Sequence, residues 1–168
     1  MEIEKETKKL IEEIGGKDFQ KKVRVCYQCG TCVGGCPVAG VNEDFNPRKI
    51  MLALSRGEID EIINNDTLWF CSYCHTCLER CPQKIPVSEI IVKLKNIAAK
   101  VRGIPDGYLN ELKMIAKTGR TAPINSAIER RREKLNLPKL LQTSGEKDIE
   151  KIFKETGINL FLEKNKTD

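Results

Sequence analysis

Eight cysteines fall in two short runs, and they are the residues of this chain best suited to do chemistry. The first run, CYQCGTCVGGCP, holds Cys26, Cys29, Cys32 and Cys36 and ends at Pro37. The second run, CSYCHTCLERCP, holds Cys71, Cys74, Cys77 and Cys81 and ends at Pro82. Every spacing matches at an offset of 45 residues, so we interpret the two runs as an internal duplication.

The spacing C-x2-C-x2-C-x3-C-P is that of a ligand run for [4Fe–4S] clusters. Three closely spaced thiolates can reach three corners of one cubane, whereas the proline pushes the fourth cysteine out of helical geometry and away from that cubane. In two-cluster ferredoxins, the fourth cysteine binds the other cluster. The pattern therefore predicts two [4Fe-4S] clusters. The first would be bound by Cys26, Cys29, Cys32 and Cys81, and the second by Cys71, Cys74, Cys77 and Cys36.

Two other cofactors are compatible with parts of the pattern. Cys71, Cys74 and His75 spell C-x-x-C-H, the attachment motif of a c-type haem. Haem would leave Cys77 and Cys81 without a role and would break the repeat. Zinc sites usually use two C-x2-C pairs separated by a dozen or more residues. A zinc-bound interaction module remains a remote alternative.

The residues beside the cysteines are interpreted as neighbours of the clusters. His75 corresponds to Gly30 in the first run, so it is not part of the repeated ligand set. It is also the only histidine, which leaves no second imidazole for conventional catalysis. We expect His75, Trp69, Pro37 and Pro82 to shape the surroundings of the clusters, and we predict no catalytic residue.

Capped helices flank both runs. Asn46, Pro47 and Gly57 are typical of the cap, first residue and end of a helix. After the second run, a stripe of apolar residues predicts a helix over 86–103. Further helices are expected at 3–14, 58–64, 108–116, 123–135 and 148–156, and the only strand-like piece is 23–25. The prediction is an all-α protein with an N-terminal helix (1–19), a cluster domain (20–103) and a helical C-terminal arm that docks on a partner (104–168).

Composition restricts the classes of function. The chain has 40% hydrophobic and 32% charged residues, with neither a membrane-span pattern nor an apolar signal-peptide core. We expect a cytoplasmic protein, in which reducing conditions favour metal ligation over disulfides. The formal net charge of +5 would fall to about +1 with two clusters of about −2 each. The basic excess thus gives little support to nucleic-acid binding, and we predict neither nucleic acid nor membrane as a partner.

Three segments carry a family resemblance: CYQCGTCVGGCPVAG, WFCSYCHTCLERCPQKIPV and GRTAPINSAIERRREKLNLP. The chain resembles proteins with an α-helical ferredoxin domain. Within these it is similar to the C subunit of the soluble heterodisulfide reductase of methanogenic archaea.

The resemblance implies an electron relay without a substrate site of its own. In that family, the C subunit passes electrons from the flavin-containing A subunit, which performs electron bifurcation, to the catalytic B subunit. The B subunit reduces the heterodisulfide of coenzyme M and coenzyme B in methanogenesis, and a hydrogenase or formate dehydrogenase supplies the electrons. The alternative is the same two-cluster module in another oxidoreductase, such as a glycolate-oxidase-like or sulfur-metabolism complex.

Overall fold

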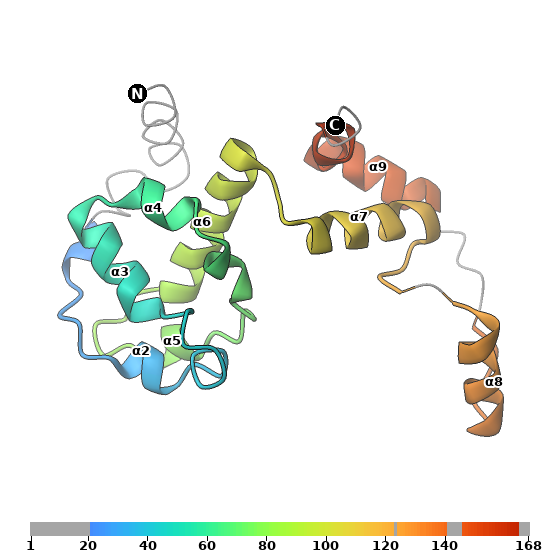
Figure 1. The fold of residues 1–168 in the computed structure, drawn as a ribbon, viewed down its shortest axis with the longest axis horizontal. Helices are drawn as coiled ribbons and strands as arrows, with labels where there is room; N and C mark the ends of the chain where they lie inside the picture. Colours follow the sequence, from blue (N-terminus) through green and yellow to red (C-terminus); the bar gives the residue numbers. More distant parts are fainter. Residues whose placement is uncertain (1–20, 123, 141–145, 165–168) are drawn as a thin grey trace. The chain divides into compact units, whose positions relative to one another are not determined.

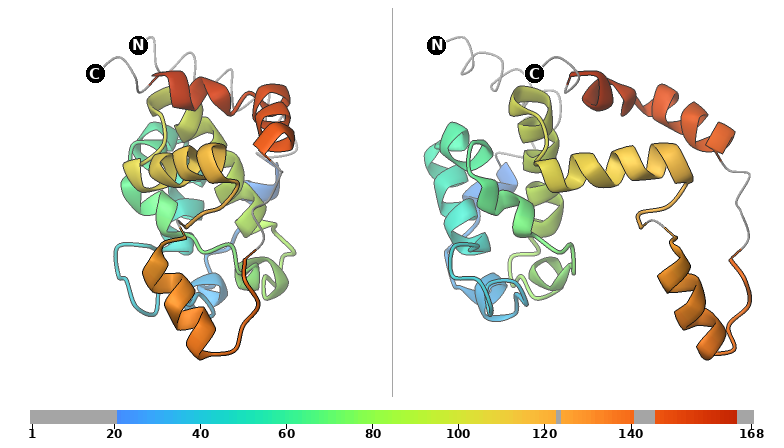
Figure 2. Two further views of the ribbon diagram at one scale, coloured as in Figure 1. Left: turned by 90° about the vertical axis from the view of Figure 1, so that its right-hand side faces the viewer. Right: turned by 45° about the vertical axis from the view of Figure 1, so that its right-hand side comes forward.

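All regular elements in the described part of the chain are helical (Figures 1 and 2). The computed structural model describes residues 21–122, 124–140 and 146–164. The all-α prediction is confirmed for these residues, while the helix expected at 1–19 lies outside them. The chain separates into two units, Met1–Gly103 and Ile104–Asp168.

The first unit is built from five α-helices and one 3-10 helix in the described residues. They are α2 (Thr31–Gly34), α3 (Pro47–Arg56), α4 (Ile59–Ile63), η1 (Asp66–Phe70), α5 (Thr76–Glu79) and α6 (Val87–Arg102). The short helix α2 packs on α3 and α5, while α5, α4 and η1 all pack on α6. The long helix α6 is therefore the element around which the second cysteine run is placed (Figure 1).

The caps predicted for α3 are confirmed. The Asn46 side chain accepts a hydrogen bond from the Lys49 amide at 3.1 Å, and Pro47 is the first helical residue. Gly57 ends the helix at φ 79°, a left-handed conformation that suits glycine. The strand-like interpretation of residues 23–25 is wrong, because residues 21–24 are helical. Val23 is buried in the core of this unit, and its apolar side chain there outweighs its preference for strands.

Apolar side chains from α3, α4, η1 and α6 form the core of the first unit. The buried residues of α6 are Val87, Ser88, Ile90, Ile91, Leu94, Ile97 and Ala98. Ile62 and Ile63 of α4 and Leu68 of η1 are buried in the same cluster. Burying one such side chain stabilises the fold by ~1.5–3 kcal/mol. Since five of the eight cysteines pack against this cluster from its edge, the core supports the cysteine runs directly.

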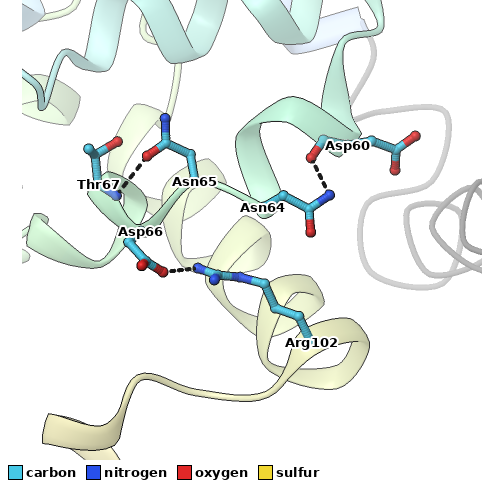
Figure 3. Close-up of polar contacts among 6 residues, drawn as sticks. All are labelled: Asp60, Asn64, Asn65, Asp66, Thr67 and Arg102. Carbon is cyan, nitrogen blue, oxygen red and sulfur yellow. Dashed lines mark hydrogen bonds and ion pairs between the residues drawn. The ribbon is translucent and has the colours of Figure 1, made fainter.

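Polar contacts join η1 to its neighbours just before the second run begins (Figure 3). The Asn65 side chain accepts a hydrogen bond from the Thr67 amide at 2.9 Å, and the Asn64 side chain donates to the Asp60 carbonyl at 2.8 Å. Arg102, at the end of α6, forms an ion pair with Asp66 at 2.7 Å. These contacts fix the direction in which the chain enters Cys71.

The second unit contains α7 (Asp106–Thr118), α8 (Ser126–Lys134), α9 (Glu146–Thr156) and α10 (Asn159–Lys164). Helix α7 packs on α9 and α10, with Leu109 and Phe153 buried (Figure 2). Helix α8 starts three residues later than predicted, because the Asn125 side chain caps it through the Ile128 amide at 2.9 Å. None of the described helices has both the length and the apolar character needed to cross a membrane.

Candidate metal centre

The two cysteine runs share an unusual backbone as well as a spacing. The second residue after the first cysteine of each run is left-handed, with φ 61° at Gln28 and 64° at Tyr73. So is the residue after the second cysteine, with φ 85° at Gly30 and 60° at His75. A one-turn helix follows in each case, α2 or α5, and carries the third cysteine. These tight turns wrap each loop around a small volume, as a cluster-binding loop requires.

The two runs meet through α2 and α5, and Gly35 allows the approach. A Cβ at this position would lie 3.0 Å from Thr76 Cγ2 and 3.2 Å from Arg80 Cδ, both in or beside α5. The neighbouring Gly34 has nothing within 4 Å of such a Cβ. Gly35 therefore provides room for the other run, which is a different use from the room beside a cluster that glycines in such a loop would suggest.

A pocket of about 310 Å³, part of it open to solvent, brings together Cys36 and the first three cysteines of the second run. Its lining comprises Cys36, Cys71, Cys74, Cys77, His75, Ser72, Ser88, Phe45, Pro47 and Ile91. These cysteines come from segments 35 residues or more apart, so only the packing of the two runs can join them. The pocket contains the four cysteines that the spacing predicts for the second cluster.

The other four cysteines are connected by their electrostatic contacts. The pKa of Cys32 is raised by burial and by the nearby thiolates of Cys26 and Cys29. The pKa of the Tyr27 hydroxyl is raised by partial desolvation and by the thiolates of Cys29 and Cys81. Tyr27 is thus close to a cysteine of each run. These contacts connect Cys81 with the first run, in the way that the pocket connects Cys36 with the second.

The thiols of the two runs have matching hydrogen bonds. Cys29 lies 3.3 Å from the Thr31 hydroxyl, and this bond is the main reason that its pKa is lowered. Thr76 lowers the pKa of Cys74 in the same way. A thiolate with a lowered pKa is the form that binds metal. Both cysteines are exposed, at the outer edge of their loops.

The fourth cysteines are also treated alike. The Ala39 amide donates to Cys36 Sγ at 3.5 Å, and the Ile85 amide donates to Cys81 Sγ at 3.3 Å. Pro37 and Pro82 follow these cysteines as turn residues and have no N–H of their own to donate. They direct the chain so that later amides reach the sulfur atoms.

The most buried thiol marks the point where the two sites are closest. Burial raises the pKa of Cys77 to about 11, and the thiolates of Cys71, Cys32 and Cys74 add to the effect. So many mutually repelling thiolates call for bound cations to offset their charge. In the described residues, no three His, Cys, Asp or Glu side chains converge on a single ion. The thiols surround a volume, which suits a cubane with four separate iron corners.

Comparison with known proteins gives the same cofactor. Residues 22–85 match the family described as a 4Fe-4S dicluster domain. The iron–sulfur C subunit, number 2, of the CoB–CoM heterodisulfide reductase of Methanocaldococcus jannaschii is 36% identical, over 82% of this chain and 74% of the relative. The corresponding C subunit from Methanopyrus kandleri is 34% identical, over 93% of this chain and 82% of the relative. The C subunit of the H(2):CoB-CoM heterodisulfide,ferredoxin reductase of Methanothermobacter marburgensis is 33% identical, over 95% and 86%.

The chain belongs to the family of heterodisulfide reductase C subunits. It is an iron–sulfur subunit of an oxidoreductase, and its dicluster domain and eight cysteines are those of a protein with two [4Fe-4S] clusters. The resemblance stated from the sequence is thereby confirmed.

His75 and Trp69, two of the predicted neighbours, lie beside the second run in this iron–sulfur subunit. His75 lines the pocket, its Nδ1 is 3.1 Å from the hydroxyl of the buried Ser88, and its ring meets that of Tyr73 edge-on at 4.8 Å. Trp69 is partly buried and packs against the core.

Two basic side chains near the first cysteine of each run were not anticipated. Lys95 of α6 donates hydrogen bonds to the carbonyls of Cys71 and Trp69, at 3.0 Å and 3.4 Å. Arg48 of α3 donates to the Gln28 side chain at 3.3 Å, and Gln28 in turn donates to Cys26 Sγ at 3.4 Å. The sequence places Lys95 away from the apolar stripe of its helix. Nothing in the spacing of letters shows that a loop carbonyl lies beside it.

Proposed function

We propose that this protein relays electrons through two [4Fe-4S] clusters, from the flavin-containing A subunit to the catalytic B subunit that reduces the heterodisulfide of coenzyme M and coenzyme B. The pocket that joins Cys36 to Cys71, Cys74 and Cys77 is the observation that carries the proposal. When bound, the clusters supply two sites that each take up and release one electron. The protein holds the two sites close together and keeps them near its surface.

The proposed ligand sets follow from this arrangement. The first cluster takes Cys26, Cys29, Cys32 and Cys81, and the second takes Cys71, Cys74, Cys77 and Cys36. The pocket lining supports the second set, and the position of Tyr27 beside Cys29 and Cys81 supports the first. Because each set borrows one cysteine from the other run, binding of either cluster also ties the two halves of the repeat together.

Short separation between the two sites supports a relay. The thiolate of Cys32 raises the pKa of Cys77, although the two cysteines belong to different proposed clusters. Each site also reaches the surface through an exposed cysteine, Cys29 in the first run and Cys74 in the second. A pair of neighbouring clusters with separate openings can take electrons from one partner and deliver them to another.

Residues near the second site have proposed supporting roles. His75 positions its ring between the pocket and Ser88, and we assign it to tuning of the second cluster. Trp69 shields the segment that leads into Cys71 from solvent. Pro37 and Pro82 end the loops so that the amides of Ala39 and Ile85 reach the fourth thiolates.

The domain division also forms part of the proposal: residues 20–103 bind the clusters, and residues 104–168 dock on a partner. Within the second unit, Leu135, Leu137, Leu140, Ile152 and Leu160 are exposed apolar side chains. We expect this arm to bind the catalytic B subunit. Loss of co-purification in a chain truncated after Gly103, with iron retained, is the expected result. Unchanged affinity of the truncated chain for the B subunit would refute the role of the arm.

The larger assembly differs among relatives, whose names specify hydrogen as an electron source or, in Methanococcus maripaludis, hydrogen and formate. We expect a hydrogenase or a formate dehydrogenase in the complex of this chain as well. A similar protein in Archaeoglobus profundus is named only as resembling the C subunit of heterodisulfide reductase, which keeps a different oxidoreductase as the second candidate setting.

Anaerobic purification of the native complex tests the function. The expected result is about eight irons and eight acid-labile sulfides per chain, together with the A and B subunits and heterodisulfide reduction. About two zinc ions per chain instead would contradict the cluster assignment. Full iron content with a different catalytic partner would retain the relay and replace its setting.

A further inference from the structure

Lys95 places a positive charge against the start of the second cysteine run. Its Nζ lies 3.0 Å from the Cys71 carbonyl oxygen, 3.4 Å from the Trp69 carbonyl oxygen and 5.8 Å from the centre of the Trp69 ring. An ammonium group has three donors and no acceptor, so two carbonyls and an aromatic face suit the protonated form. The side chain thus has one well-defined position.

The charge of Lys95 is only partly screened by water. Its side chain is half-buried between α6 and the segment that enters the second run. In the described residues no carboxylate forms an ion pair with it. The Cys71 thiolate is the charged group whose field it feels. A charge in such a position acts on its neighbours more strongly than a solvated surface charge does.

The corresponding position of the first run has a different arrangement. Cys26 accepts its hydrogen bond from the uncharged amide of Gln28, and the exposed Arg48 contacts Gln28 rather than the cysteine. Water surrounds the Arg48 guanidinium and screens it. The two proposed clusters therefore have unequal electrostatic surroundings despite their duplicated ligands.

We propose that Lys95 raises the reduction potential of the cluster bound by Cys71, Cys74, Cys77 and Cys36 above that of the first cluster. Reduction adds a negative charge to a cluster, and a nearby fixed positive charge stabilises the reduced form more than the oxidised form. A chain that holds one electron then holds it at the second run. This inference rests on the ligand sets proposed above, and it assigns Lys95 a positioning and tuning role.

An anaerobic redox titration followed by EPR spectroscopy tests the inference on the full chain with both clusters. Lys95→Met should lower one of the two reduction steps by at least a tenfold change in its equilibrium constant, which is about 59 mV for one electron. The other step should stay in place. Lys95→Arg should keep the original potential. Lys100→Met removes the same charge from an exposed position of the same helix and should move neither step.

A Cys74→Ala background identifies the cluster concerned. There the second cluster should be absent, and Lys95→Met should leave the remaining step unchanged. An unshifted potential in Lys95→Met with full iron content would overturn the inference and leave the relay intact. Iron loss in both Lys95→Met and Lys95→Gln would also overturn it, by making Lys95 a structural support of the loop. Zinc in place of iron in the wild-type chain would instead refute the proposed function.

Discussion

The first and second cysteine runs have the same ligands and the same turns, yet their surroundings differ. Gly30, Gly34 and Gly35 make the first run slim, whereas the second has His75, Glu79 and Arg80 at these positions. Gln28 contacts Cys26 in the first run, and Lys95 contacts Cys71 in the second. The duplication thus preserves what binds iron, and the neighbouring residues are free to make the two sites different.

The slimness of the first run and the bulk of the second are complementary. Gly35 lies where Thr76 and Arg80 of the second run approach, so the absence of a side chain on one side accommodates side chains on the other. Two identical runs with bulky residues at this position would collide. The asymmetry is therefore needed for the packing of α2 on α5 and also provides the means to separate two potentials.

The largest expected effect tests whether the fourth cysteines exchange partners. In Cys36→Ala/Cys74→Ala, both changes should affect the same cluster, and about four irons per chain should remain. In Cys36→Ala/Cys29→Ala, the changes should affect both clusters, and almost no iron should remain. Iron and sulfide analysis measures both variants. The reverse order of iron contents would show that each run binds its own cluster.

The next largest effect concerns the contact between the runs. Gly35→Val should destabilise the protein by ~1–3 kcal/mol, because its Cβ would press on Thr76 and Arg80. Gly34→Ala is the matched control, and open space around that position predicts unchanged or slightly increased stability. Urea unfolding of the iron-loaded chain measures both. Equal midpoints for the two variants would show that the α2–α5 contact can relax without loss.

A smaller effect is expected where η1 is joined to α6. Asp66→Asn removes the ion pair with Arg102, whose Asp66 side chain is largely exposed. Such a pair contributes ~0.2–1 kcal/mol and is screened by salt. The variant should lose this amount at low ionic strength and approach wild-type stability at high salt. A loss that persists undiminished in high salt would contradict an electrostatic origin.

The smallest effect on stability is expected at the position where the runs differ most visibly. His75→Gly relieves a left-handed backbone at φ 60° but removes the hydrogen bond to Ser88. Each of these effects is ~1 kcal/mol and they oppose one another, so the free energy of unfolding should change little. The EPR spectrum of one cluster should change, while that of the other stays the same. A change in both spectra, or in neither, would remove His75 from the surroundings of the second cluster.

The local parts of the fold could be predicted from the sequence. Asn46, Pro47 and Gly57 act within one or two turns of the chain, and their capping roles are visible in the letters. The short helices α2 and α5 were not predicted, because four residues are too few to show a helical period. The mistaken strand at 23–25 has a related cause: β-branched residues there favour a strand locally, and burial of Val23 in a helical core decides otherwise.

By itself, the sequence determined the eight cysteines, their duplication and the cofactor that such spacing binds, because ligand type and loop length are properties of a short segment. Only the tertiary structure decided which residues of distant segments meet. Cys36 enters the pocket of the second run, Gly35 faces α5, and Lys95 reaches Cys71 because the helices pack around α6. Contacts of this kind depend on the close packing of a whole unit, and no short stretch of letters contains that information.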